Sequence, residues 1–273
     1  MRPNLQRRVQ RYGWDKAAKH YEAYWAKPLR PVQDRLMDMA ELRLGEQVLD
    51  VACGTGLVTL RAAHAVGNEG AVVGTDVSDE MVKATDRVVQ EQKLGNVRTE
   101  RMGAEALSLP GASFDVALCS LGLMYVPEPI LALREMLRVL RPGGRCVISV
   151  WGRRDRCGWA DIFPIVDSRV TTQVCPMFFQ LGTGDALEFV MGEAGFTLTE
   201  NDRIPTVLNH LTADDACGAS FLGGPVAMAY SRFDELTRTE AHQEYLNSIE
   251  PYREGAAYAI PGECVIAAGV KAE

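Results

Sequence analysis

The chain has 273 residues, which is enough for one large domain, or a domain with a cap, around a sizeable buried core. Its 47% hydrophobic and 24% charged residues are ordinary for a soluble globular protein. The net charge of −7 argues against a general nucleic-acid binder, because such proteins present a basic surface.

The first 45 residues predict helices that carry aromatic side chains. Residues 1–30 contain eight Lys and Arg residues but only two acidic residues. This segment therefore either contacts an anionic partner or presents a solvated basic face. Tyr12, Tyr21 and Trp25 could form a lid that stacks on a planar molecule, or could pack as ordinary amphipathic-helix aromatics. We treat residues 1–45 as an N-terminal helical cap segment.

Residues 48–56 read Val-Leu-Asp-Val-Ala-Cys-Gly-Thr-Gly. An apolar run that ends at an acid predicts a buried parallel strand. Gly54 and Gly56 lack the Cβ atoms that would block close approach of a ligand, and they permit positive φ. The sequence from residue 57 onward predicts a helix, so we expect a strand, a glycine loop and a helix.

Apolar strands and amphipathic helices alternate from residue 48 to 151, which is typical of an α/β fold with a doubly wound, mostly parallel sheet. Helices are expected at 57–66, 79–93 and 129–140, the second capped by Ser78 and the third stopped by Arg-Pro-Gly-Gly. With two further strands after residue 151, we expect a sheet of seven strands. The expected strands are 47–52, 71–76, 97–102, 114–120, 145–151, 197–209 and 257–270.

The part of the chain after residue 151 predicts an insertion over the sheet. A loop and helix region (152–195) precedes the strand at 197–209, and a polar helical stretch separates that strand from the last one. Ligands of open α/β sheets lie at the carboxyl ends of the strands. We therefore expect an α/β core of residues 46–210 and 257–273, with residues 211–256 forming a cap insertion over the site.

The seven cysteines occur singly, with no CxxC pair and no His-rich segment, so no metal site is predicted. Several lie in apolar strands, which favours buried, reduced thiols. The N-terminus lacks the pattern of a signal peptide, and no apolar run approaches the ~18 residues of a membrane span. We expect a cytoplasmic protein without stable membrane insertion, and the sequence leaves its oligomeric state open.

Two kinds of cofactor compete for the glycine loop. A dinucleotide fingerprint needs a third glycine, but Thr59 stands at that position. Asp76 follows Gly56 by twenty residues at the end of the second strand, where a carboxylate can accept both hydroxyls of a ribose. Any adenosine cofactor would use such an acid.

Five segments occur in order at near-expected spacings, and together they resemble the class I S-adenosylmethionine-dependent methyltransferases. The most similar branch acts on small molecules and includes the methyltransferases of ubiquinone and menaquinone biosynthesis. The resemblance covers about residues 40–151. The segments are Asp50-x-Ala-x-Gly-x-Gly56, Gly74-Thr-Asp-Val-Ser-x-x-Met81, Ala104-Glu-x-Leu107, Ser113-Phe-Asp-Val116 and Leu140-Arg-Pro-Gly-Gly144.

The resemblance implies S-adenosyl-L-methionine as cofactor, and it implies a role for each matching residue. The loop would contact the methionine part, with Asp50 near the ammonium group, and Asp76 would hold the ribose. Val77 and Met81 would sandwich the adenine. The cofactor residues so implied are Asp50, Ala52, Gly54, Gly56, Asp76, Val77, Met81, Ala104, Glu105 and Ser120.

One departure from the family pattern affects the adenine edge, which Ala104 and Glu105 would line. Relatives often carry an acid just before this Ala-Glu pair, and here the residue is Gly103. Glu105 or a backbone oxygen would then accept from the adenine amino group. Ser120, at the end of the fourth strand, would lie beside the methyl group that is transferred.

The acceptor is expected to be a small apolar or aromatic metabolite, and its C, O or N atom stays open. A hydroxyl or an acidic carbon would need a general base within hydrogen-bond reach, whereas a nucleophilic carbon or nitrogen would not. His210, at the mouth where the insertion begins, is the best-placed base, with a capping or surface role as the alternative. Tyr125 could orient an acceptor hydroxyl or pack in the core, and Tyr21 could screen the reaction from water.

Two other functions remain open from the sequence. The first is an NAD-dependent oxidoreductase, which Thr59 disfavours. The second is a partner subunit that binds the methyl donor without catalysis. Metalloid methylation would need paired cysteines, but Cys157, Cys175 and Cys217 are widely spaced.

Overall fold

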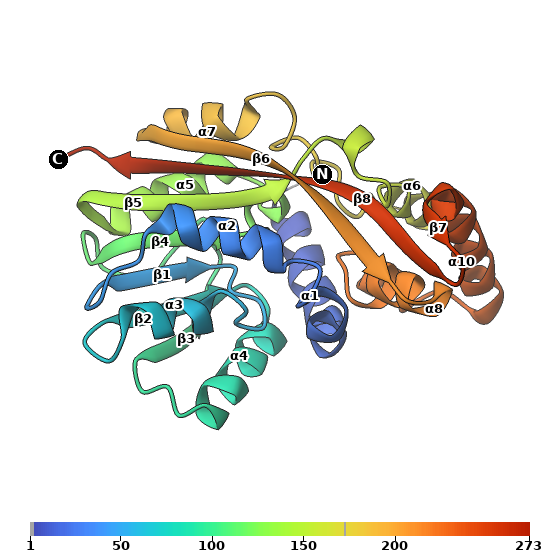
Figure 1. The fold of residues 1–273 in the computed structure, drawn as a ribbon, viewed down its shortest axis with the longest axis horizontal. Coiled ribbons are helices and arrows are strands. Elements are labelled where there is room, and N and C mark those ends of the chain that lie inside the picture. The colour runs from blue at the N-terminus through green and yellow to red at the C-terminus, as the bar shows by residue number, and fades with distance from the viewer. Residues whose placement is uncertain (1–2, 172) are drawn as a thin grey trace.

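A computed structural model describes residues 3–171 and 173–273 of the chain. Its core is a twisted sheet with the strand order β3-β2-β1-β4-β5-β8-β6, to which the two-residue strand β7 adds beside β8 (Figure 1). The strands are β1 (Gln47–Val51), β2 (Ala71–Asp76), β3 (Val97–Arg101), β4 (Phe114–Ser120), β5 (Leu140–Trp151), β6 (Phe196–His210), β7 (Arg253–Glu254) and β8 (Ala257–Lys271).

The first five strands are all parallel, and β8 runs antiparallel to both β5 and β6. The predicted α/β class and mostly parallel sheet are therefore confirmed, with one short strand more than the seven expected. The long strands β6 and β8 extend beyond the others, as Figure 1 shows. This difference in length matters for the site, because the carboxyl end of β6 lies past those of β1 and β4.

The helices lie on both faces of the sheet. The chain moves toward the β3 edge of the sheet when it passes from β1 to β2, and toward the β6 edge when it passes from β4 to β5. Right-handed crossovers then place the first helix and the last on opposite faces. In Figure 1, α2 and α3 lie in front of the sheet. The helices of this part are α2 (Arg30–Ala40), α3 (Thr59–Val66), α4 (Asp79–Glu91), α5 (Pro129–Val139), α6 (Ile162–Asp167) and α7 (Ala186–Ala194).

Local signals explain where these elements begin and end. The Ser78 hydroxyl accepts a hydrogen bond from the Met81 amide and caps α4, as predicted. Helix α5 ends at Val139, just before the proline–glycine signal. The chain continues directly as β5, which begins at Leu140. The pairing of β5 with β4 has an irregular register between Phe114 and Val116 of β4. The expected boundary at 145 is thus five residues late.

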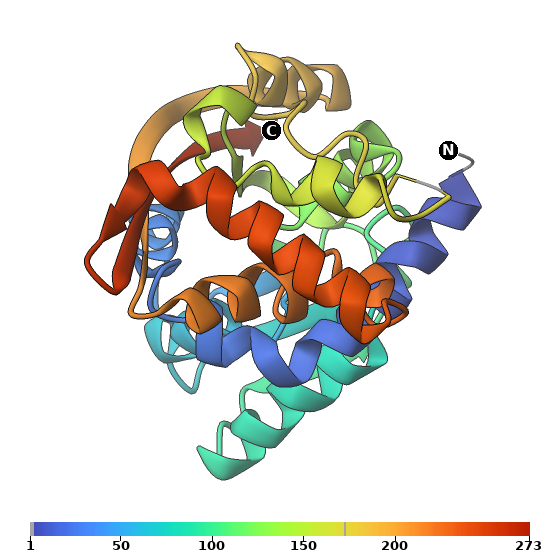
Figure 2. The same cartoon turned by 90° about the vertical axis from the view of Figure 1, so that its right-hand side faces the viewer.

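Helix α1 (Pro3–Trp25) crosses the carboxyl ends of the strands, at the right in Figure 1 and facing the viewer in Figure 2. It packs between α4 of the core and the segment that follows β6. That segment contains α8 (Ala213–Cys217), a π-helix (Gly218–Leu222), α9 (Ala227–Tyr230) and α10 (Glu235–Ile249).

The packing of α1 on this segment is close because two glycines face it. A Cβ on Gly218 would collide with the Tyr24 hydroxyl, and one on Gly223 would lie 3.1 Å from the Trp25 Nε1 atom. Larger residues would push the helix away from the sheet. Helix α1 and the segment that follows β6 are thereby brought together above the strand ends.

All seven cysteines are buried and free, in agreement with the prediction of buried thiols. In residues 3–171 and 173–273, no helix combines the length and the apolar character that crossing a bilayer requires.

Candidate active site

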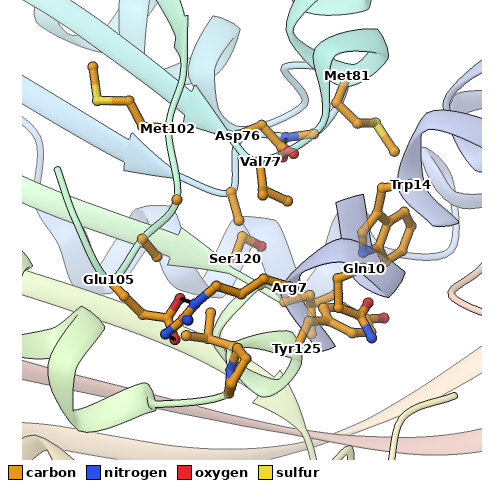
Figure 3. A pocket seen from close by; sticks show the side chains of 18 of the residues that line it. Arg7, Gln10, Trp14, Asp76, Val77, Met81, Met102, Glu105, Ser120 and Tyr125 are labelled. Carbon is orange, nitrogen blue, oxygen red and sulfur yellow. Dashed lines mark hydrogen bonds and ion pairs between the residues drawn. The ribbon is translucent and has the colours of Figure 1, made fainter. Parts of the chain in front are cut away.

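A cavity, which we call the main cavity, opens under α1 at the carboxyl ends of β1, β2 and β4 (Figure 3). Parallel strands end at one edge of a sheet, so loops far apart in sequence meet there. Eight of the ten residues expected to contact the cofactor line this cavity. They are Ala52, Gly54, Asp76, Val77, Met81, Ala104, Glu105 and Ser120.

Asp76 forms one wall of the main cavity together with Val77 and Met81 (Figure 3). Its carboxylate accepts hydrogen bonds from the backbone N–H groups of Gly54 (3.0 Å) and Ser78 (2.8 Å), which fix the side chain against the glycine loop. Burial raises the pKa of Asp76 to about 6 despite these bonds. The acid is therefore both oriented and only partly charged near pH 6.

The two glycines of the loop have different structural roles. Gly54 has φ +58° and lines the main cavity, and a Cβ there would meet no atom within 4 Å. Gly56 has φ +91°, and a Cβ there would lie 2.8 Å from Cγ2 of Thr85 on α4. Gly54 thus keeps the loop open toward the cavity, whereas Gly56 lets the loop pack against a helix and does not line the cavity.

Asp50 also lies outside the main cavity, at the end of β1 and buried. Its carboxylate accepts a 2.6 Å hydrogen bond from the hydroxyl of Thr59, the residue that stands in place of the third glycine. Burial raises the pKa of Asp50 to about 7. In the sequence, Thr59 argued only against a pyrophosphate site. In the structure, its hydroxyl holds the carboxylate of Asp50 by a hydrogen bond.

A smaller cavity, the loop cavity, lies beside the main one, and Asp50 lines it together with Gln33, Gly54 and Thr55. The Thr55 hydroxyl is buried and has no hydrogen-bond partner among the described residues. A buried polar atom without a partner costs free energy unless a ligand or water completes it. The loop cavity can therefore take a polar group.

The wall opposite Asp76 is an ion pair between Arg7 of α1 and Glu105 (Figure 3). Arg7 donates from Nε to Oε2 (2.7 Å) and from Nη2 to Oε1 (3.0 Å) of Glu105, and it also reaches Glu128 at 2.6 Å. The backbone N–H of Glu128 donates to Glu105 as well (3.1 Å). The carboxylate of Glu105 is thus held by α1 and by the start of α5.

A third cavity, the aromatic cavity, adjoins the main cavity through shared side chains of α1 and of the β4 end, among them Tyr21 and Tyr125. Seven aromatic residues line it, and we call them the aromatic belt. Each packs on the next with ring centroids 5.0–6.4 Å apart, edge to face. In order around the belt they are Tyr21, Trp14, Tyr125, Phe178, Trp159, Trp151 and Trp25.

The two end members of the belt, Tyr21 and Trp25, are four residues apart on α1 and therefore lie on the same helix face. Both residues belong to the lid expected from the sequence, while Tyr12 is exposed and lines neither cavity. Tyr21 lines the main, loop and aromatic cavities alike. Tyr21 and Leu121 are the residues at which the three cavities meet.

The hydroxyls of Tyr21 and Tyr125 are the ones that the belt offers to a ligand. Burial raises the pKa of each above its usual value, and the charge of Asp76 adds to the effect at Tyr21. Both groups stay protonated at neutral pH, so they donate hydrogen bonds and do not act as bases.

The structure does not bring His210 to these cavities, and the expectation that it lies at the mouth of the site needs correction. His210 ends β6 as expected, but it is buried opposite Tyr258 of β8. The reason is the length of β6, since a strand of fifteen residues ends beyond the short strands that form the site. Burial also lowers the pKa of His210.

Among the lining residues of the main cavity that were not expected from the sequence, three lie on α1, namely Arg7, Gln10 and Trp14. Together with Tyr21 and Trp25 they recur at steps of three, four and seven residues, which places them on one face of a helix. That spacing was visible in the sequence. It did not show that this face turns toward the strand ends.

Comparisons with known proteins agree with the geometry. A family model described as a methyltransferase domain matches residues 48–144. The chain is 39% identical over 132 residues to the nocamycin O-methyltransferase of Saccharothrix syringae, covering 48% of this chain and 47% of that protein. Residues 48–144 are a class I methyltransferase domain.

A second relative is the ubiquinone/menaquinone biosynthesis C-methyltransferase of Azotobacter vinelandii, 42% identical over 113 residues, which are 41% of this chain and 45% of that enzyme. The chain thus spans about half the length of these curated relatives. The methyltransferase resemblance expected from the sequence is confirmed for this part of the chain.

Solved structures agree on the fold beyond the matched domain. A Bacillus halodurans C-125 protein, described as a candidate methyltransferase, aligns with a TM-score of 0.64 at 20% identity, covering 88% of this chain and 99% of its own. A SAM-dependent methyltransferase from Aquifex aeolicus aligns with a TM-score of 0.54 at 20% identity, covering 68% and 90%. At this identity the likeness concerns the fold alone.

The residues present fit S-adenosylmethionine, the cofactor that the sequence resemblance implies. The main cavity offers an oriented acid at Asp76 and an apolar wall at Val77 and Met81. The loop cavity adds a backbone approach at Gly54 and the unpartnered hydroxyl of Thr55. An adenosine with a zwitterionic tail needs an acid for its ribose, an apolar wall for its adenine and polar groups for its tail.

Proposed function

We propose that the protein transfers a methyl group from S-adenosyl-L-methionine to a small apolar or aromatic molecule that enters the aromatic cavity. The observation that supports this most directly is the junction of the three cavities at Tyr21. The residues of the cofactor motifs line two of these cavities, and the third is aromatic. A donor and an acceptor bound on either side of Tyr21 would meet there.

The proposal assigns the adenosine to the main cavity. Asp76 accepts from the ribose hydroxyls, and Val77 and Met81 pack on the two faces of the adenine. Ala104 and Glu105 face the edge of the ring. Because Arg7 neutralises Glu105, this carboxylate can accept from an amino group without leaving a free charge in the cavity.

The methionine part belongs to the loop cavity in this proposal. Ala52 and Gly54 allow its close approach, and Asp50, held by Thr59, faces the ammonium group. Gly56 acts indirectly by letting the loop pack on α4. Ser120 lies at the end of β4, where the methyl group would point toward Tyr21 and Tyr125.

When bound, S-adenosylmethionine supplies an electrophilic methyl group on a sulfonium centre. The protein then has to exclude water and align the acceptor. The aromatic belt does both, since α1 covers the strand ends and the polar groups of its side chains are limited to the hydroxyls of Tyr21 and Tyr125 and the tryptophan N–H groups. Residues 1–45 and 211–256 would serve as the cap segments that hold this cover in place.

The experiment is calorimetric titration of S-adenosylhomocysteine into Asp76→Ala and into Glu80→Ala as matched control. Asp76→Ala should lose at least about tenfold in affinity, because it removes a charge-assisted pair of hydrogen bonds. Glu80 lies on the exposed first turn of α4 and pairs with Lys83, so its replacement should leave the affinity unchanged. Unchanged binding by a folded Asp76→Ala variant would refute the ribose assignment.

A further inference from the structure

All four tryptophans of the chain lie in the aromatic belt. They come from two separate parts of the sequence, Trp14 and Trp25 on α1 and Trp151 and Trp159 at and after the end of β5. A core that needs only apolar volume would use the more common leucine or phenylalanine. Tryptophan has the ring face that attracts a cation most strongly.

The surroundings of the belt favour positive charge. No charged side chain lines the aromatic cavity among the described residues. The nearby buried acids Asp50 and Asp76 form no ion pair with a basic side chain in the described ranges. Among the described residues, Arg7 is the one basic side chain that lines the main cavity, and it is already bound by Glu105 and Glu128.

We infer that the acceptor atom is an amine nitrogen and that the aromatic belt binds the methylated ammonium product. This inference rests on the proposed function and names its acceptor class. An anionic acceptor would meet no basic side chain in the aromatic cavity, and the neutral N–H groups of Trp25 and Trp159 carry no charge to balance it. A cation, by contrast, is stabilised there by ring faces without a buried counter-charge.

The transfer itself is balanced without a base. The lone pair of a tertiary amine forms the new N–C bond, the C–S bond breaks, and its electron pair stays on sulfur. The positive charge moves from sulfur to nitrogen. The amine reacts as its free base, so a protonated amine first gives its proton to the solvent, and the transfer step itself releases none. A hydroxyl acceptor would need a proton acceptor, whereas the only hydroxyls of the belt, those of Tyr21 and Tyr125, remain protonated.

The experiment compares three probes of one shape and different charge. Choline, 3,3-dimethyl-1-butanol and 3,3-dimethylbutyrate are titrated against the full chain saturated with S-adenosylhomocysteine, and tryptophan fluorescence reports binding. Choline should bind about tenfold tighter than the neutral alcohol, and the anion should bind weakest. Equal or tighter binding of the alcohol, or no binding of choline, would overturn the inference.

Variants at Trp25 locate the effect in the belt, because Trp25 lines the aromatic cavity but not the main or loop cavity. Trp25→Leu should abolish most of the preference for choline over the alcohol, and Trp25→Phe should keep part of it. An unchanged preference in Trp25→Leu would contradict the inference. Both variants should bind S-adenosylhomocysteine like the parent, which separates this test from that of the proposed function.

If the donor product binds and choline does not, the amine inference fails while the methyltransferase proposal stands. If S-adenosylhomocysteine itself does not bind, the proposed function fails first. Transfer of a labelled methyl group to N,N-dimethylethanolamine, whose product is choline, gives an independent readout. It should exceed transfer to isosteric alcohols and phenols.

Discussion

Arg7 and Glu105 join the first helix of the chain to the cofactor-binding part of the sheet. The guanidinium donates to both carboxylate oxygens, at 2.7 and 3.0 Å, although the two residues are 98 positions apart. The pair closes the side of the main cavity that faces Asp76 (Figure 3). A ligand that fills this cavity therefore enters or leaves past α1.

We expect Arg7→Ala to speed the release of S-adenosylhomocysteine about fivefold, because a two-point charged hydrogen bond no longer holds α1 down. Stopped-flow displacement followed by tryptophan fluorescence measures the rate. Arg8→Ala is the matched control, since Arg8 is exposed on the same helix turn. Equal release rates in the two variants would show that α1 is not fixed by this pair.

Substitutions of the two loop glycines should differ in their effects on stability and on donor affinity. Gly56→Ala should lower the free energy of unfolding by about 1–3 kcal/mol, because its Cβ presses on Thr85 at a positive φ. Gly54→Ala should cost only about 1 kcal/mol, since its Cβ meets open space, but it should lose more donor affinity. Urea unfolding and calorimetry on both variants test this. The reverse order of effects would contradict the division of roles.

Asp50 should make the free protein less stable at high pH. Its pKa is about 7 in the folded state and near 3.8 when unfolded, so the folded state binds more protons between these values and stability falls as pH rises through that window. Asp50→Asn should therefore be more stable than the parent by about 2 kcal/mol at pH 8. Near pH 4 the difference should vanish.

Urea titrations without donor at the two pH values measure this effect. Asp76, with a pKa of about 6, follows the same sign over a narrower window. A stability difference that is the same at both pH values would mean that Asp50 is ionised in the folded protein throughout.

Tyr21→Phe should leave the pH profile of methyl transfer unchanged between about pH 6 and 9. Burial and the neighbouring Asp76 raise the pKa of the Tyr21 hydroxyl above its usual value, so it stays protonated over this range. The rate should fall by less than about tenfold, the effect of one lost hydrogen bond. Loss of a limb of the profile would instead identify Tyr21 as a proton-transfer group.

The order of strands and helices from residue 48 to 151 could be predicted because each element carries its own signal. Ser78 caps α4, and apolar residues predominate in the buried parallel strands β1 and β4. The cofactor motifs sit at the strand ends, and parallel strands end at one edge. Asp76, Gly54 and Ser120 therefore converge in any fold with this alternation.

The sheet, the glycine loop and the acid that faces it could be predicted from local patterns, since they depend on contacts among near neighbours and on strand direction. The rest of the site depends on tertiary contacts. Strand length removed His210 from it, and the docking of α1 against Gly218 and Gly223 brought Arg7 and Trp14 into it. Such contacts join distant segments through side-chain shape, which no local pattern specifies.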